Sequence, residues 1–322
     1  MRLYDADGRD RPVELEAGMA SRVGAKQLLW VDLDRHDRDE LDAVAAAVGL
    51  APGVVDRLAT PSDRPDLTQY PDHIHLSLQA LEANGATDDI DAVPLSRKTV
   101  DIVAGHGWVV TVHEGPLAAL ARLDATTEGE TRLGELDAAS FVGSIADEVL
   151  ADYLELVEEI EREIDRLDQR ALHHPADRDV LSTIVRIRRR ISFVRRTLAP
   201  HRVAFAALAR PEMALHEELG EPWPGLTDRL QRALDAVENL RELLLGSFDI
   251  HMGRAAQDAN ETMKLLTLLS AVLLPAVVLA GVMGMNFDMP FFEDTTNFWV
   301  VLVAMGVFAL SLLGIARVRH WF

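Results

Sequence analysis

The sequence lacks the residues and motifs of the common catalytic sites. It contains no cysteine, which excludes disulfide frameworks, thiolate zinc sites and cysteine nucleophiles. It also has no phosphate-binding glycine loop, no G-x-S-x-G turn and no H-E-x-x-H pair. The closest approach, His216-Glu217, is followed by ELG and lacks the second histidine. An enzyme is therefore the least supported class of function.

Positive charge is scarce as well. The chain has 52 Asp and Glu residues against 32 Lys and Arg, and its net charge is -20. Binding to phosphates needs clustered positive charge, so we expect no nucleic-acid partner. Divalent cations are more natural counter-ions for such a chain.

The N-terminus, MRLYDADGRDRPVELEAG, lacks the basic and then apolar pattern of a signal peptide. Near the other end, Leu265–Met283 and Phe298–Ala316 each hold about nineteen residues without an ionisable side chain, enough to cross a hydrocarbon core roughly 30 Å thick. Pro275 is tolerable there because neighbouring helices can satisfy the freed carbonyl. A buried globular helix is the alternative, but two such segments in succession favour two transmembrane helices.

The charges flanking these spans predict their orientation. Lys264 precedes the first span and basic residues follow the second, whereas the loop between them carries only acids. The positive-inside rule then places both termini in the cytoplasm of a multi-pass protein of the cell (inner or plasma) membrane, with the lipid bilayer as a partner. The flanking groups are Arg317, Arg319 and His320 after the second span, and Asp288, Glu293 and Asp294 in the loop.

Residues 1–135 are predicted to form a cytoplasmic α/β domain. Four short apolar runs have strand patterns, and two further segments have helical patterns. The predicted strands are Gln27–Leu33, His73–Leu81, Thr99–Gly105 and Trp108–Glu114, and the predicted helices are Arg38–Gly49 and the stretch after Pro116.

The next part of the chain is predicted to be helical. An acidic stretch, Asp152–Arg170, and a basic stretch, Ile184–Arg196, flank a turn at His173–Asp179. The arginines could bind anionic lipid or RNA, but an antiparallel helix pair joined by salt bridges is the favoured interpretation. His173 and His174 could bind a metal, although a solvated turn is favoured.

A third helix is predicted to begin after PWPG (Pro222–Gly225), with Thr227 as its N-cap, and to continue into the first span. Thr227 to Met283 would form a rod of about 85 Å at 1.5 Å per residue. One packing face ahead of the membrane comprises Leu230, Leu234, Val237, Leu240, Leu244, Phe248 and Met252.

Small and weakly polar residues share one stripe along this helix. At about 100° per residue they stay within about 80° of one direction, and they extend beyond the membrane. The stripe could be the wall of a pore, or a face packed against the second span. Its members are Asp249, Ala256, Asn260, Met263, Thr267, Ser270, Leu274, Val278, Gly281 and Met285.

The end of the stripe decides between these interpretations. GMNF, Gly284–Phe287, directly follows the first span and resembles the signature of the CorA family of magnesium transporters. Met263–Pro290 resembles the family's first span and loop, the long preceding helix resembles its stalk, and the α/β domain resembles its cytoplasmic domain. The tripeptide Gly-Met-Asn alone is weak evidence for the family. Its position after a long helix and ahead of a second span makes it a specific signature.

Two positions depart from the family pattern. Met283 stands where a tyrosine is common, which removes aromatic packing at the mouth. The family's Met-Pro-Glu-Leu is replaced by MPFFED, Met289–Asp294, so the negative charge of the loop moves to Glu293 and Asp294.

The resemblance implies an α+β membrane protein that assembles as a homopentameric funnel, with the first spans around a central pore and the second spans outside them. Its parts would be residues 1–135, a cytoplasmic α/β domain; 136–262, a cytoplasmic helical domain and stalk; and 263–322, a two-helix transmembrane pore domain. It also implies that magnesium bound between acidic subunit interfaces holds the channel closed, so that Mg²⁺ is both substrate and regulatory ligand.

The chemistry of magnesium suits the implied mouth, whose selectivity filter would be Gly284, Met285 and Asn286. Magnesium sheds water reluctantly, so a site that moves it quickly should hold it hydrated. Side-chain carbonyls of Asn286 could accept hydrogen bonds from those waters and release the ion easily. Asn260 and Asp249 could form inner metal stations, Met263 and Leu266 an apolar gate, and the loop residues Asp288, Glu293 and Asp294 would attract cations. The remaining expected pore-lining residues are Thr267, Ser270, Leu274 and Gly281.

The favoured function is passive uptake of magnesium, with cobalt and nickel as further candidate ions, driven by the membrane potential. A zinc or other divalent-cation transporter of the same superfamily is the first alternative, but zinc prefers histidine or thiolate ligands and the stripe has neither. A membrane-anchored scaffold that conducts no ions is the alternative from another class.

Overall fold

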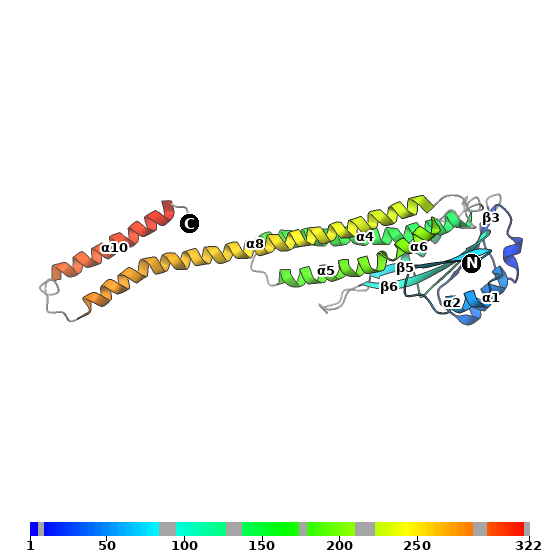
Figure 1. Cartoon of the computed structure of the whole chain (residues 1–322), viewed down its shortest axis with the longest axis horizontal. Coiled ribbons are helices and arrows are strands. Elements are labelled where there is room, and N and C mark those ends of the chain that lie inside the picture. Colours follow the sequence, from blue (N-terminus) through cyan, green and yellow to red (C-terminus); the bar gives the residue numbers. More distant parts are fainter. Residues whose placement is uncertain are drawn as a thin grey trace. The chain divides into compact units, whose positions relative to one another are not determined.

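The computed structural model describes residues 1–5, 10–83, 95–126, 137–173, 179–209, 223–285 and 295–318. These residues divide into two compact units, the first ending at Ser247 and the second beginning at Phe248. Helix α8 (Trp223–Met283) runs through both, and α10 (Thr295–Val318) belongs to the second (Figure 1).

Seven strands of the described residues form one mixed sheet in the first unit, in the order β2-β1-β3-β7-β6-β5-β4. Neighbouring strands are antiparallel except β3 and β7, which are parallel, with Leu29 opposite Trp108 and Leu33 opposite Val112. The four strands predicted from apolar runs are all present. The strands are β1 (Arg2–Asp5), β2 (Arg11–Pro12), β3 (Gln27–Leu33), β4 (Asp66–Gln69), β5 (His73–Ala83), β6 (Leu95–Gly105) and β7 (Trp108–His113).

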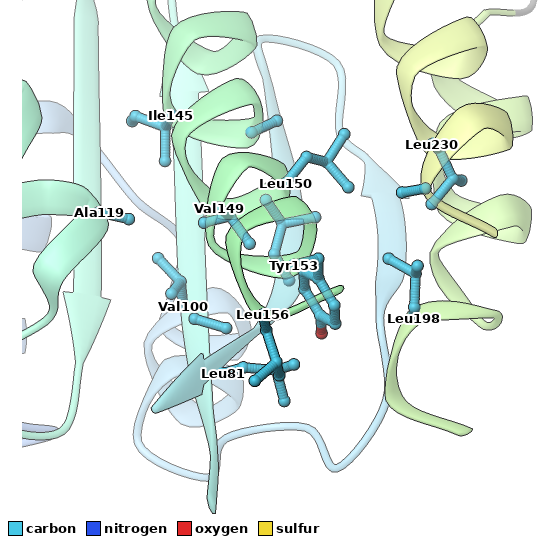
Figure 2. Packing of buried hydrophobic residues seen from close by; sticks show 14 of the residues in the cluster. Leu81, Val100, Ala119, Ile145, Val149, Leu150, Tyr153, Leu156, Leu198 and Leu230 are labelled. Atoms are coloured by element: carbon cyan, nitrogen blue, oxygen red, sulfur yellow. The ribbon is translucent and has the colours of Figure 1, made fainter. Parts of the chain in front are cut away.

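Helices cover both faces of this sheet, which explains why its central strands are almost continuously apolar. Successive side chains of a strand point to opposite faces, so Val110 joins the cluster formed with α1 and α2, whereas Val109 joins the cluster formed with α3 and α4. Figure 2 shows Val149 and Tyr153 of α4 within the second cluster. The helices among the described residues of this unit, besides α8, are η1 (Met19–Arg22), α1 (Arg38–Val48), α2 (Pro52–Leu58), α3 (Ala118–Thr126), α4 (Ala138–His173), α5 (Asp179–Leu198) and α6 (His201–Leu208).

Helices α4 and α5 lie side by side in antiparallel directions, joined by the predicted salt bridges. Glu163 accepts from Arg186 at 3.1 Å and from Arg190 at 2.5 Å, and Arg190 also reaches Glu159 at 3.2 Å. Arg190 is only 9% exposed, and these acids balance its charge. The interpretation of the basic stretch as half of a helix pair is confirmed. The side chains of His173 and His174 lie outside the described residues.

Helix α8 begins earlier than predicted, at Trp223. The expected N-cap, Thr227, is wrong: it lies inside the helix, where its buried hydroxyl has no hydrogen-bond partner among the described residues. Proline is tolerated in a first turn because the N–H groups there have no partner within the helix. PWPG therefore contains the start of the helix rather than a break before it.

The predicted packing face of α8 is right in its first half and wrong at its end. Leu230, Leu240 and other predicted members are buried, but Phe248 is 36% and Met252 47% exposed. The buried positions continue along the helix at steps of three and four residues. At the end of the series these positions are occupied by polar residues rather than by Phe248 and Met252. The buried series is Leu226, Leu230, Ala233, Val237, Leu240, Leu244, Ser247 and His251.

Strand β5 extends past the end of β4, and side chains from two helices take up the hydrogen-bonding groups of its backbone there. The Gln79 N–H donates to His201 Nε2 of α6 at 3.0 Å, and the Gln79 carbonyl accepts from the Tyr153 hydroxyl of α4 at 2.6 Å. The His201 Nδ1–H donates to the Leu198 carbonyl at 3.0 Å. His201 must therefore stay neutral for its Nε2 to accept. Besides the apolar contacts, Gln79 links α4 and α6 to the sheet by hydrogen bonds.

The folded protein is expected to lose stability in mild acid through His201. Burial lowers its pKa to about 4, although the carbonyls of Leu198 and Thr197 oppose the shift. Since an unfolded histidine titrates near 6.5, this contribution is fully present above about pH 6.5 and declines as the pH falls towards 4, by about 2 kcal/mol at pH 5. Denaturant unfolding of the purified full-length protein at pH 7.5 and 5 measures it.

The matched variant is His201→Gln, whose amide oxygen can still accept from the Gln79 N–H but does not titrate. Its stability should change less between the two pH values than that of the parent. The pKa of His113 is also shifted: burial lowers it, but Asp32 and the Gly115 carbonyl outweigh burial and raise it. Because His113 is present in both proteins, its contribution to the pH dependence cancels when the parent and the variant are compared. Equal pH dependence in parent and variant would refute the assignment.

Candidate ion-conduction pathway

The residues predicted to line a pore lie along one face of α8. Gly253, Ala256, Asn260, Met263 and Thr267 border a shallow concavity of about 480 Å³, together with Gln257, Glu261 and Lys264 at its sides. Because α8 is continuous from Trp223 to Met283, the same face continues through Ser270, Leu274 and Gly281. The helix therefore brings the small and polar positions together as one stripe.

Exposure within one chain does not distinguish this stripe from its surroundings. Met263 is 64% and Leu266 62% exposed, but Leu265, on another side of the helix, is 59% exposed. Both α8 and α10 contain segments long and apolar enough to cross a membrane. Lipid or other copies of the chain must cover such surfaces.

Partly shielded residues mark a different side of the first span. In α8 these are Leu268, Val272, Pro275, Ala276 and Met283, whereas in α10 they are Asn297, Val301, Met305, Ala309, Leu312 and Ala316. Both series repeat at helical spacing, and in antiparallel order a pairing of Leu268 with Ala316 also pairs Met283 with Val301. This is the pattern expected of two sides that face each other across the hairpin.

The stripe lies away from this shielded side. At about 100° per residue, the α10-facing side of α8 is centred roughly 140° around the helix from the stripe. The small and polar residues therefore lie outside the shielded side. Leu265 falls within the α10-facing sector.

At the C-terminal end of the first span, α8 closes with two backbone hydrogen bonds. The Gly284 N–H donates to the Ala280 carbonyl at 3.0 Å, and the Met285 N–H donates to the Val282 carbonyl at 3.2 Å. A Cβ added at Gly284 would come no closer than 3.4 Å to the Ala280 oxygen, so this chain alone does not require glycine there. Asn286, Asp288, Glu293 and Asp294 lie outside the described residues.

Oxygen acceptors are available along the stripe. The Thr267 hydroxyl donates its proton to the Met263 carbonyl at 2.7 Å, which leaves the lone pairs of Oγ1 to accept from water. Asn260 is exposed and offers an amide oxygen one turn below Lys264 and Met263. Such a surface can receive hydrogen bonds from the waters of a hydrated cation.

A single chain does not assemble a metal site from these groups. Among the described residues, no three His, Asp or Glu side chains lie close enough to hold an ion. Asp249 and Asn260 are about three turns apart on one helix, so a ligand ring at either level needs several copies of the chain. The nearest histidine, His251, is buried on a different side of α8 from the stripe.

Comparison with known proteins shows the family of the chain. Residues 25–317 match the family described as CorA-like Mg²⁺ transporter protein. The chain is 25% identical over 301 residues to the cobalt/magnesium transport protein CorA of Thermotoga maritima, covering 91% of this chain and 83% of that protein. It is also 25% identical over 261 residues to the zinc transport protein ZntB of Klebsiella pneumoniae, covering 80% and 76% of the two chains.

The fold is shared with a solved structure over the whole chain. The complete CorA magnesium transporter of Methanocaldococcus jannaschii superimposes with a TM-score of 0.77 at 19% identity, covering 100% of this chain and 98% of that one. The family match extends from the α/β domain through both apolar helices. The chain therefore belongs to the CorA family and is a two-span membrane transporter of divalent cations.

Proposed function

We propose that this transporter is a magnesium channel, which carries Mg²⁺ passively into the cell as a homopentamer whose termini are cytoplasmic. The first spans would line the central pore with the stripe of α8. Gly284, Met285 and Asn286 would form the selectivity filter at its outer mouth, and Asp288, Glu293 and Asp294 would attract cations. Cobalt and nickel are the expected further substrates.

The observation that carries this proposal is the separation of the two sides of α8. The shielded side would pack against α10, which would leave the stripe with Asn260, Thr267 and Ser270 to face other copies around an axis. Polar groups inside a membrane usually face a water-filled cavity or a partner because burial in lipid is costly. A central pore supplies the water.

Ion choice follows from the ligands that the stripe offers. Amide, hydroxyl and backbone carbonyl oxygens suit a magnesium ion that keeps several waters. Zinc binds histidine and thiolate more readily, but the described part of the stripe has no histidine and the chain has no cysteine. These ligands favour magnesium over zinc as the physiological substrate.

The driving force requires no catalytic site. Two charges that cross a potential of about 100 mV gain roughly 4.6 kcal/mol, since each charge gains about 2.3.

Regulation would come from magnesium itself. Copies with a charge of -20 repel one another, and magnesium bound between their cytoplasmic acids would favour a closed, symmetric funnel.

Flux into liposomes tests the function. The purified full-length protein, reconstituted with an interior-negative potassium diffusion potential, should take up magnesium, and uptake should fall as internal magnesium rises into the millimolar range. Parallel measurements with zinc should show slower uptake at equal concentration. Faster zinc uptake would favour the zinc alternative, and no flux of any divalent cation would favour a scaffold.

A further inference from the structure

The hairpin of α4 and α5 has two outer flanks of opposite charge. Its inner ion pairs, between Glu159 or Glu163 and Arg186 or Arg190, mark the sides on which the two helices face each other. The acidic flank is the exposed face of α4 formed by Glu155, Glu158, Glu161 and Asp165, and the basic flank is the exposed face of α5 formed by Arg188, Ser192 and Arg195.

Both flanks point away from the partner helix. At about 100° per residue, the acidic flank is centred roughly 125° from the side of α4 that faces α5, and the basic flank roughly 170° from the side of α5 that faces α4. Arg188 has no ion-pair partner among the described residues. Among the described residues, the ion-pair partner of Arg195 is Glu238 of α8, at 3.6 Å. Most of the charge on these flanks is therefore not neutralised by the described part of the same chain.

The two flanks also match in level along the hairpin. Because α4 and α5 are antiparallel, the pairs Glu163–Arg186 and Glu159–Arg190 show which residues lie at the same height. By the same offset, Arg195 is level with Glu155 and Glu158, and Arg188 is level with Glu161 and Asp165. Rotation about an axis parallel to the helices keeps these heights unchanged.

We propose that neighbouring copies dock side by side through these flanks, with the basic flank of α5 against the acidic flank of α4 in the next copy. A ring needs two different complementary surfaces on each chain, which the flanks provide. Exposed ion pairs contribute only about 0.2–1 kcal/mol each, so the contact mainly sets orientation and offsets the repulsion between acidic chains. The inference rests on the proposed ring assembly.

The absence of native cysteine allows a direct test by crosslinking. The full-length double variant Glu155→Cys/Arg195→Cys, treated in membranes with a short bismaleimide, should give a ladder of crosslinked oligomers on denaturing gels. The two positions lie on different helices of one hairpin, and a crosslink formed within one chain leaves it a monomer, so a ladder reports only links between copies. Each single variant should give no ladder.

Two controls make the result decisive. Glu155→Cys/Leu181→Cys uses the same flanks with an offset of about 20 Å along α5 and should not crosslink. Asn260→Cys alone, on the stripe, should crosslink adjacent copies if the proposed pore exists. A ladder from Asn260→Cys without one from the flank pair overturns the docking and leaves the pore standing. If neither the flank pair nor Asn260→Cys gives a ladder, both the docking and the ring are overturned. A ladder from the flank pair alone supports the docking and counts against the pore.

Discussion

Replacing Asn286 by alanine is expected to abolish magnesium uptake while leaving assembly intact. Each copy would lose one carbonyl acceptor for the waters around the ion and no packed apolar volume. A hydrogen bond contributes about 1 kcal/mol, so the loss of only two acceptors weakens capture of the hydrated ion by more than about tenfold. The loss of the whole ring should leave no measurable flux in liposomes.

The matched control is Asn297→Ala, the same substitution at the outer end of α10. Asn297 lies on the partly shielded side of α10 and outside the proposed filter, so its replacement should change uptake much less. Crosslinking through a cysteine at Asn260 reports whether each variant still assembles. Uptake at the parental rate in an assembled Asn286→Ala protein would refute the assignment of the selectivity filter.

Long, strongly patterned elements were predictable from the sequence. The strand Gln27–Leu33 and the start of α4 at Ala138 follow directly from apolar runs and helical periodicity. Short elements were missed because their signals are local and weak. The two-residue β2 and the edge strand β4 gain their structure from pairing with longer strands, and α2 begins at a proline, Pro52, inside a segment that has no periodic pattern.

The errors in α8 arose where residue type and geometry disagree. Phe248 and Met252 fit an apolar face by type, but the helix buries Ser247 and His251, which continue the spacing of three and four. Nothing in the composition of a single helix shows which face a neighbour will cover. In contrast, the stripe from Asn260 to Gly281 was predictable as a set of positions, because it depends on helical geometry alone.

Small polar residues serve both packing and conduction, so the stripe alone does not define its role, and the sequence assigns it to a pore through the resemblance carried by GMNF. The burial of Leu268 and the partial shielding of Val272 and Met283 are a separate observation, because they mark a side of the first span that does not include the stripe. Which atoms of neighbouring copies meet at the stripe depends on assembly, and an isolated chain does not contain that contact.

Gating should depend on Met263 and Leu266. Both lie near the inner end of the first span, on the stripe or at its edge, and both are more than 60% exposed within one chain. In a ring of copies they would form stacked apolar constrictions, which exclude water and therefore a hydrated divalent ion. Replacing either by serine should wet the constriction. At millimolar internal magnesium, where the parent is closed, flux should rise by about tenfold, the change that corresponds to 1.4 kcal/mol of barrier.

Leu265→Ser separates a gate from a packing face. Leu265 has the same chemistry and similar exposure, 59%, but it lies in the sector that faces α10. Its replacement should leave closure by internal magnesium nearly unchanged, because the α10-facing sector does not border the axis. Uptake into liposomes loaded with magnesium measures all three variants under one condition. Similar increases at Leu265, Met263 and Leu266 would mean that loosened packing, and not a wetted constriction, raises the flux, and the stripe would then be a packing surface after all.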